Sequence, residues 1–183
     1  KHHFAEVIKY SVFPTGKIFR PLLVYCLAHD IGNIDKGHTW LAMAIELHHT
    51  YTLIHDDLPS MDNDDYRRGR LSSHKKFSEW EAIRAGDALL SLSYEFLSNI
   101  DPKYISEILK IFSNATGPKG LILGQIKDLA NENHSFEDLL EIHRLKTGEL
   151  IQICLTSTCV LNESHELKSE IKKLGYALGE NFQ

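Results

Sequence analysis

Residues 39–57 (TWLAMAIELHHTYTLIHDD) are apolar around most of a helical circumference, and this segment constrains the fold more than any other. A stripe at three- and four-residue spacing consists of Leu41, Ile45, His48 and Thr52. A helix that is apolar on all sides must be buried, so other parts of the chain have to surround it. The sequence therefore predicts a buried central helix.

The remaining segments also have helical spacing. Glycine and proline lie between them, and almost no segment alternates polar and apolar residues as a half-buried strand would. Helix starts are indicated at Ser78, at Asp101 before Pro102, and at Ser135, which has Asp138 in the capping-box position. We therefore predict an all-α fold.

The domain organisation is simple. The helix that starts at Ser135 is expected to run unbroken to residue 161, and residues 163–183 are expected to be helical to their end. No repeat or low-complexity linker divides the 183 residues, which suffice for one well-filled core. We expect residues 1–183 to form a single domain, with further residues at both ends, because the sequence opens within a helix and stops without a turn signal.

Charge and cysteine content exclude several kinds of partner. The formal net charge is −5 and no long basic stretch occurs, so nucleic acid is not expected. No stretch approaches the roughly 20 apolar residues of a membrane span. The three cysteines (Cys26, Cys154 and Cys159) form no CxxC pair, which is typical of a protein in a reducing cytoplasm.

Residues 55–70 (HDDLPSMDNDDYRRGR) place a dense acidic cluster directly before a dense basic one. The carboxylates suit Mg²⁺ or Ca²⁺, but an EF-hand fails because the sixth loop position counted from Asp62 is Arg67, not glycine. Arginines would repel a bare cation, whereas an anionic ligand could bridge metal and arginine. A diphosphate is such a ligand, since Mg²⁺ takes phosphate oxygens and arginine offers them a bidentate fork.

The spacing of the aspartates requires a break in the helix. On a continuous helix, Asp56 and Asp62 would lie about 240° apart. Pro59 and Ser60 can supply the break. We therefore expect Asp56 at the C-terminal end of the buried helix and Asp62 folding back from the following loop. The alternative is a solvated acidic turn with charge-balancing arginines.

These residues resemble the first aspartate-rich motif of the trans-isoprenyl diphosphate synthases, most closely the bacterial farnesyl diphosphate synthases. DDxxxxD corresponds to residues 56–62, and the following RRG to residues 67–69. Further motifs that match in the family's order are TGKIFRP (15–21, with Thr15 replacing a glycine), AGDALL (85–90), GQIKDL (124–129), KTGELI (146–151) and LGENFQ (178–183).

The resemblance implies an all-α isoprenoid-synthase-type helical barrel around a deep central cavity, usually a homodimer. It implies a Mg²⁺-dependent prenyltransferase that condenses an allylic diphosphate, dimethylallyl or geranyl, with isopentenyl diphosphate. The expected product is farnesyl diphosphate. Three Mg²⁺ ions are expected in the complete enzyme.

The resemblance also implies roles for individual residues. Asp56 and Asp62 correspond to the Mg²⁺ ligands, Asp57 to a weaker candidate behind them, and Arg67 to the arginine that binds the allylic diphosphate. The isopentenyl-diphosphate site corresponds to Lys17, Arg20, His49 and Arg68. Lys146 and Thr147 correspond to the residues that face the diphosphate and the cation. Gln183 corresponds to the glutamine that precedes the second aspartate-rich motif. The residues expected to act in catalysis are Asp56, Asp62, Arg67 and Lys146.

Product length is expected to depend on Tyr51. It lies five residues, or about 7.5 Å along a helix axis, before Asp56, where an aromatic ring could close the floor of the cavity. The resembling farnesyl synthases carry an aromatic residue at this offset. Blander alternatives are a core tyrosine at Tyr51, a core histidine at His49, and surface charges at Lys17 and Arg20.

One feature of the family is missing, because its second motif, DDxxD, should begin a few residues after Gln183. The 183 residues alone are therefore expected to be catalytically impaired. Rival interpretations are a geranylgeranyl or longer-chain synthase, a non-catalytic partner subunit, and a His-Asp metal-dependent phosphohydrolase suggested by His49 and His55. The phosphohydrolase leaves Arg67 and Arg68 unexplained.

Overall fold

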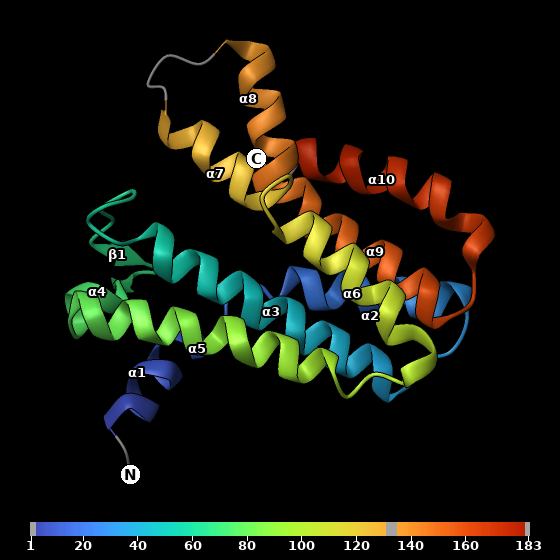
Figure 1. The fold of residues 1–183 in the computed structure, drawn as a ribbon, viewed down its shortest axis with the longest axis horizontal. Coiled ribbons are helices and arrows are strands. Elements are labelled where there is room, and N and C mark those ends of the chain that lie inside the picture. Colours follow the sequence, from blue (N-terminus) through green and yellow to red (C-terminus); the bar gives the residue numbers. More distant parts are fainter. Residues whose placement is uncertain (1–2, 131–134, 182–183) are drawn as a thin grey trace.

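The central helix of the protein lies at the middle of an all-helical arrangement (Figure 1). The computed structural model describes residues 3–130 and 135–181. Its elements are α1 (His3–Val12), α2 (Phe19–Ile31), α3 (Lys36–Asp56), β1 (Tyr66–Arg67), β2 (Arg70–Leu71), α4 (Ser73–Lys76), α5 (Glu79–Leu97), α6 (Pro102–Thr116), α7 (Leu121–Ala130), α8 (Phe136–His143), the π-helical turn η1 (Arg144–Gly148), α9 (Glu149–Leu161), the 3₁₀ turn η2 (His165–Leu167) and α10 (Lys168–Asn181).

Helix α3 is the predicted buried helix. It runs beside α5 for much of its length and also packs against α2 and α9 (Figure 1). Its predicted stripe is buried throughout, and Leu41 and Ile45 are fully inaccessible. They join a core to which α6 contributes Phe112 and α9 contributes Ile153. Among the described residues, no helix is long and apolar enough to cross a membrane.

A glycine allows the close approach of α5 to α3. A Cβ atom added at Gly86 would collide with the imidazole ring of His55. Nε2 of His55 lies 3.1 Å from the carbonyl oxygen of Ile83 on α5. The two helices are therefore held at a spacing that a larger side chain at residue 86 would prevent.

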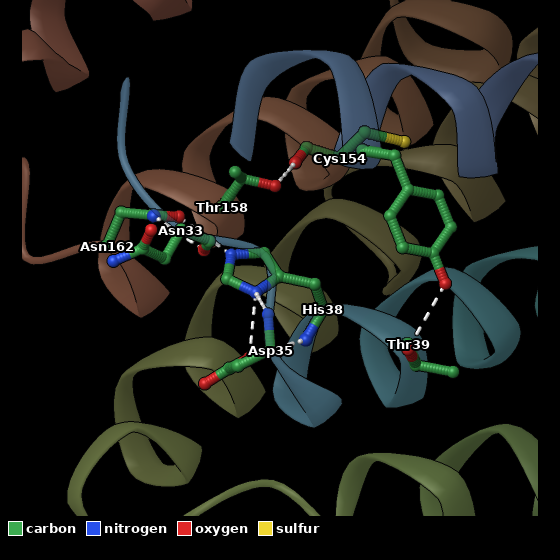
Figure 2. Close-up of polar contacts among 8 residues, drawn as sticks. Asn33, Asp35, His38, Thr39, Cys154, Thr158 and Asn162 are labelled. Carbon is green, nitrogen blue, oxygen red and sulfur yellow. Dashed lines mark hydrogen bonds and ion pairs between the residues drawn. The ribbon is translucent and has the colours of Figure 1, made fainter. Parts of the chain in front are cut away.

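A polar network joins the loop before α3 to the end of α9 (Figure 2). Asp35 caps α3 by accepting a hydrogen bond from the backbone N–H of His38, and the His38 ring lies 2.8 Å from the same carboxylate. On its other side, Nε2 of His38 lies 2.7 Å from Oδ1 of Asn162. Asn162 also donates to the carbonyl oxygen of Asn33. Because His38 is buried, this network ties segments more than 120 residues apart.

Most predicted helix starts are confirmed. Asp101 accepts a hydrogen bond from the backbone N–H of Lys103 at 2.8 Å, and Ser135 forms the capping box with Asp138. Ser78 holds the N-cap position of α5, but its hydroxyl donates to the carboxylate of Glu81 instead of capping the backbone. The acidic side chain in the first turn competes for the hydroxyl.

Three details differ from the sequence prediction. Residues 135–161 are not one regular helix, because the π-helical turn η1 lies between α8 and α9. Residues 163–183 do not form a continuous α-helix, since η2 precedes α10, and residues 182–183 lie outside the described part. The two-residue strands β1 and β2 form a hairpin that no alternating pattern indicated, because such short strands carry no period.

His48 is a neutral core histidine. Its ring meets the rings of Tyr51 and Phe112 edge-on at 4.7 and 4.9 Å, and Nδ1 lies 3.4 Å from Oγ of Ser93. Nε2 has no hydrogen-bond partner within the part of the chain that the structure describes. Burial lowers the pKa of His48 to about 4.

Acid should therefore destabilise the fold through His48. The unfolded chain takes up a proton below pH 6.5, whereas folded His48 stays neutral down to about pH 4, so the free energy of unfolding falls across this window by up to about 3 kcal/mol. We expect His48→Asn to lower the slope of the urea-unfolding free energy against pH between pH 7 and pH 4. The control His29→Asn removes an imidazole that is 80% exposed and should keep the wild-type slope. An unchanged slope in His48→Asn would contradict this assignment.

Candidate functional site

The aspartates of residues 56–62 lie at the C-terminal end of α3. Asp56 is the last residue of the helix and Asp57 caps it. The following loop folds back, so the backbone N–H of Asp62 donates to the carbonyl oxygen of Asp56 at 2.9 Å. Burial raises the pKa of Asp56 to about 6; Lys146 opposes this rise and the negative charge of Asp62 adds to it. The two carboxylates therefore share one electrostatic environment.

These two carboxylates fit a magnesium ion that is held jointly with a phosphate ligand. Within residues 3–130 and 135–181, no three His, Cys, Asp or Glu side chains converge to enclose a metal. Mg²⁺ does not need such a cage, because it is commonly bound by one or two carboxylates, substrate phosphates and water. The oxygen donors at Asp56 and Asp62 are of the hard type that Mg²⁺ prefers.

The hairpin after the loop presents the arginines. Arg68 (φ 53°) and Gly69 (φ 74°) form the two-residue turn between β1 and β2, as in a type I′ hairpin, for which positive φ angles are required. Nε of Arg67 donates to Oδ1 of Asp57 at 2.9 Å, and a second guanidinium nitrogen contacts the same oxygen. Asp57 is buried, and its carboxylate is bound by Arg67.

A cavity of about 320 Å³ collects the predicted cations. It is lined by Gly16, Lys17, Ile18, Phe19, Arg20, Glu46, His49, Leu53, Arg67 and Arg68. Among the described residues, Glu46 is the only acidic one in this lining, and it lies 4.0 Å from the guanidinium of Arg68. Burial, with Arg20 and Arg68 nearby, keeps the pKa of His49 well below its usual range, so His49 is neutral. This cationic cavity suits a multiply charged anion.

Arg20 is the most buried of these cations, with 9% of its surface exposed. Burial lowers the pKa of its guanidinium, while Cys154 and Glu46 oppose that effect. Its Nε has no hydrogen-bond partner among the described residues. A buried guanidinium with an unused donor is poised to bind an anionic oxygen.

A second cavity, also of about 320 Å³, adjoins the first. Its lining is Arg20, His49, Thr52, Leu53, Asp56, Lys146, Thr147 and Leu150. Lys146 and Thr147 lie in the π-helical turn η1, a distortion that often marks functional positions. Nζ of Lys146 donates to Oδ2 of Asp128 on α7 at 2.5 Å. The first two cavities share Arg20, His49 and Leu53.

A third cavity, of about 330 Å³, continues from the second into apolar surroundings. It is lined by Tyr51, Thr52, His55, Asp56, Met61, Leu121, Ile122, Gln125, Ile126 and Leu129. Thr52 and Asp56 belong to both cavities. Burial, with Asp56 and Tyr94 adding to the effect, raises the pKa of Tyr51, so its phenol is neutral. The three cavities thus lead from clustered cations, past the aspartates, to an apolar space.

The structure brings most of the predicted site residues together. The linings of the three cavities include Lys17, Arg20, His49, Tyr51, Asp56, Arg67, Arg68, Lys146 and Thr147. Asp62 lies beside Asp56 in the exposed loop, and Gln183 falls outside the described residues.

Sequence reasoning missed Asp128 and Glu46, which contact predicted site residues. Asp128 lies in the motif GQIKDL and accepts a hydrogen bond from Lys146. Glu46 lies one turn before His49 on α3, but a lone glutamate in an apolar segment does not reveal its arginine partner.

Comparison with known proteins agrees with this geometry. The Polyprenyl synthetase family model matches residues 1–183. The chain is 38% identical to the farnesyl diphosphate synthase of Micrococcus luteus, covering 97% of this chain and 63% of the relative. It is 36% identical to geranylgeranyl pyrophosphate synthase 4 of Arabidopsis thaliana, covering 97% of this chain and 50% of the relative. The chain thus spans less than two thirds of either protein.

Solved structures share the fold. The geranyltransferase of Legionella pneumophila is 40% identical, with a TM-score of 0.87 over 98% of this chain and 67% of that one. The geranyltransferase of Helicobacter pylori, complexed with magnesium and isoprenyl diphosphate, is 34% identical, with a TM-score of 0.89 over 100% of this chain and 64% of that one. The predicted all-α isoprenoid-synthase fold is therefore confirmed, and the chain belongs to the polyprenyl synthetase family.

Proposed function

We propose that the protein is a prenyltransferase that condenses an allylic diphosphate with isopentenyl diphosphate and releases farnesyl diphosphate as its main product. The proposal concerns the complete enzyme, of which residues 1–183 would form one isoprenoid-synthase domain. The observation that carries it is a series of three neighbouring cavities, related by shared lining residues, from clustered cations past Asp56 to an apolar space. A substrate with a diphosphate head and a hydrocarbon tail would place the head among the cations and the tail in the apolar cavity.

The charges of the site suit the bond that must break. When the allylic carbon–oxygen bond ionises, the departing diphosphate gains negative charge, which fixed cations stabilise more in the transition state than in the ground state. Arg67 is held by Asp57, and Lys146 by Asp128, so both cations are oriented before substrate binds. The carbon–carbon bond then forms at the allylic cation, and a proton leaves the new chain.

Magnesium is the metal that the aspartates suit. Asp56 and Asp62 would hold it, three ions being expected in the complete enzyme, and the bound metal would neutralise charge on the diphosphate. Support comes from the hard oxygen donors at the end of α3 and from the Helicobacter pylori geranyltransferase, whose structure contains magnesium and isoprenyl diphosphate.

The apolar cavity would protect the cation from water. Its lining from α7 consists mainly of aliphatic side chains, including Leu121, Ile126 and Leu129. Water excluded from this space cannot trap the carbocation before the new bond forms.

Two further expectations stay proposals. We propose a homodimer, supported by the exposed apolar residues Phe136, Leu139 and Leu140 on α8, which sedimentation of the complete protein would test. We propose a cytoplasmic location, supported by the free thiols of Cys154 and Cys159, which microscopy of the tagged protein would test.

Removing one carboxylate tests the metal assignment. Asp56→Ala in the complete protein should lower kcat by about 100-fold or more, because charge on the leaving diphosphate loses its metal. Radiolabelled isopentenyl diphosphate incorporated into extractable product gives kcat. Asp65→Ala is the control, since Asp65 pairs with Lys75 at the surface and should keep normal turnover. Near-normal turnover in Asp56→Ala would refute the assignment.

Replacing Arg20 tests the cationic cavity. Arg20→Ala should raise KM for isopentenyl diphosphate about tenfold or more, with a much smaller change for the allylic substrate, because a lost charged hydrogen bond costs roughly 1.5–3 kcal/mol. Steady-state kinetics with each substrate varied in turn measures both constants. Since Arg20 is buried, Lys17→Ala serves as a second variant if Arg20→Ala unfolds. Equal increases of KM for both substrates would contradict the assignment of Arg20 to the isopentenyl-diphosphate site.

Product length tests the role of Tyr51. Tyr51→Ala should enlarge the third cavity and shift the products towards C20 or longer, because a growing chain no longer meets the ring. Chromatography of the dephosphorylated products measures this. Tyr51→Phe is the matched control and should still yield C15, since it keeps the ring. If Tyr51→Ala also yields only C15, another side chain ends elongation.

A further inference from the structure

Arg70 binds the arginine hairpin to the end of α1. It opens β2 and lies opposite Arg67 in the hairpin register. Its guanidinium reaches out of the hairpin, where Nη1 donates to the carbonyl oxygen of Phe13 at 2.7 Å and Nη2 donates to that of Tyr10 at 2.9 Å. The same group lies 3.8 Å from the centre of the Tyr10 ring.

Tyr10 returns a contact to the hairpin. Its hydroxyl donates to the carbonyl oxygen of Leu71 at 2.7 Å, next to Arg70. Arg70 therefore donates two hydrogen bonds to the end of α1, Tyr10 donates one to the hairpin, and the two side chains make a cation–π contact. Segments that are about 60 residues apart in the chain are joined at this point.

The chemistry of arginine suits this position. The last carbonyl groups of a helix have no partner within the helix, and they form the negative end of its dipole. A planar guanidinium can bind two of them at once while its face stacks on an aromatic ring. A lysine at this position would keep the charge but lose the fork and most of the stacking.

The two joined segments both contribute to the lining of the cationic cavity. The hairpin contributes Arg67 and Arg68, and the segment after α1 contributes Gly16 and Lys17. The Arg68 guanidinium lies 3.4 Å from the carbonyl oxygen of Pro14 and would be 3.0 Å from a Cβ atom at Gly16. Arg68 itself donates to the Pro14 carbonyl, and Arg70 adds a second attachment that opposes the repulsion between like charges on the two segments.

We propose that Arg70 is a positioning residue that fixes Arg67 and Arg68 against the Lys17 segment, so that the cavity is preformed for a diphosphate. This rests on the proposed function of the same cavity. Arg70 is absent from the lining of the cationic cavity, so it acts through its neighbours and not by touching the ligand. Binding should suffer more than turnover, because the fork holds the walls before any ligand arrives.

The test compares Arg70→Lys, Arg70→Gln and Tyr10→Leu in the complete protein. Arg84→Gln is the control, because Arg84 pairs with Asp87 on the exposed face of α5 with 68% of its side chain accessible. Calorimetry with inorganic diphosphate gives the dissociation constant. Steady-state kinetics gives KM for isopentenyl diphosphate and kcat, and thermal melting confirms folding.

We expect the dissociation constant and KM to rise about fivefold or more in Arg70→Lys and Tyr10→Leu, with kcat within about threefold of wild type. Arg84→Gln should behave as wild type. The lysine variant separates positioning from charge: a purely electrostatic role would leave Arg70→Lys normal and impair only Arg70→Gln, which would overturn the proposal. Normal binding in both Arg70→Lys and Tyr10→Leu would overturn it as well.

Failure of the proposed function would look different. If the wild-type protein bound diphosphate but formed no prenyl product, the reaction would be wrong while the affinities would still test Arg70. If the wild-type protein formed product and both Arg70→Lys and Tyr10→Leu bound diphosphate normally, only the role of Arg70 would be refuted.

Discussion

The burial of α3 is the constraint on which the rest of the structure depends. Because α2, α5 and α9 cover this helix, its side chains hold fixed directions, and its C-terminal end can carry a carboxylate at a defined place. The same helix supplies His49 to the first two cavities, Asp56 to the second and third, and Tyr51 to the third. One rigid element thus sets the relative positions of the charged and apolar ends of the site.

The charged groups of the site are paired before any ligand binds. Asp57 holds Arg67 and Asp128 holds Lys146, while Glu46 lies 4.0 Å from the Arg68 guanidinium and also interacts electrostatically with Arg20. Such pairing reduces the repulsion among clustered cations and restricts their rotamers. In the proposed reaction, charges arranged in this way need little reorganisation as the diphosphate departs.

Local sequence patterns predicted the features that depend on neighbours in the chain. Capping at Asp101 and Ser135, burial of the Leu41 stripe, and the return of Asp62 to the end of α3 all follow from spacing of a few residues. The hairpin was missed because strands of two residues carry no period, and no local signal in residues 144–148 indicated the π-helical turn. In the same way, the partner of Lys146 lies 18 residues earlier, and that of Arg70 about 60 residues earlier, separations over which helical periodicity carries no information.

Thr52 and Asp56 form a wall that the second and third cavities share. Substitutions in the charged cavity and substitutions in the apolar cavity therefore have different consequences. Charged residues on one side of this shared wall face the diphosphate in the proposed reaction, while side chains beyond it meet only hydrocarbon. Replacements on the hydrocarbon side can alter the depth of the space while the charged groups keep their partners. Descendants of such a chain could therefore diverge in the size of what they make while inheriting an unchanged chemistry, with a single helical turn of α3 dividing the two.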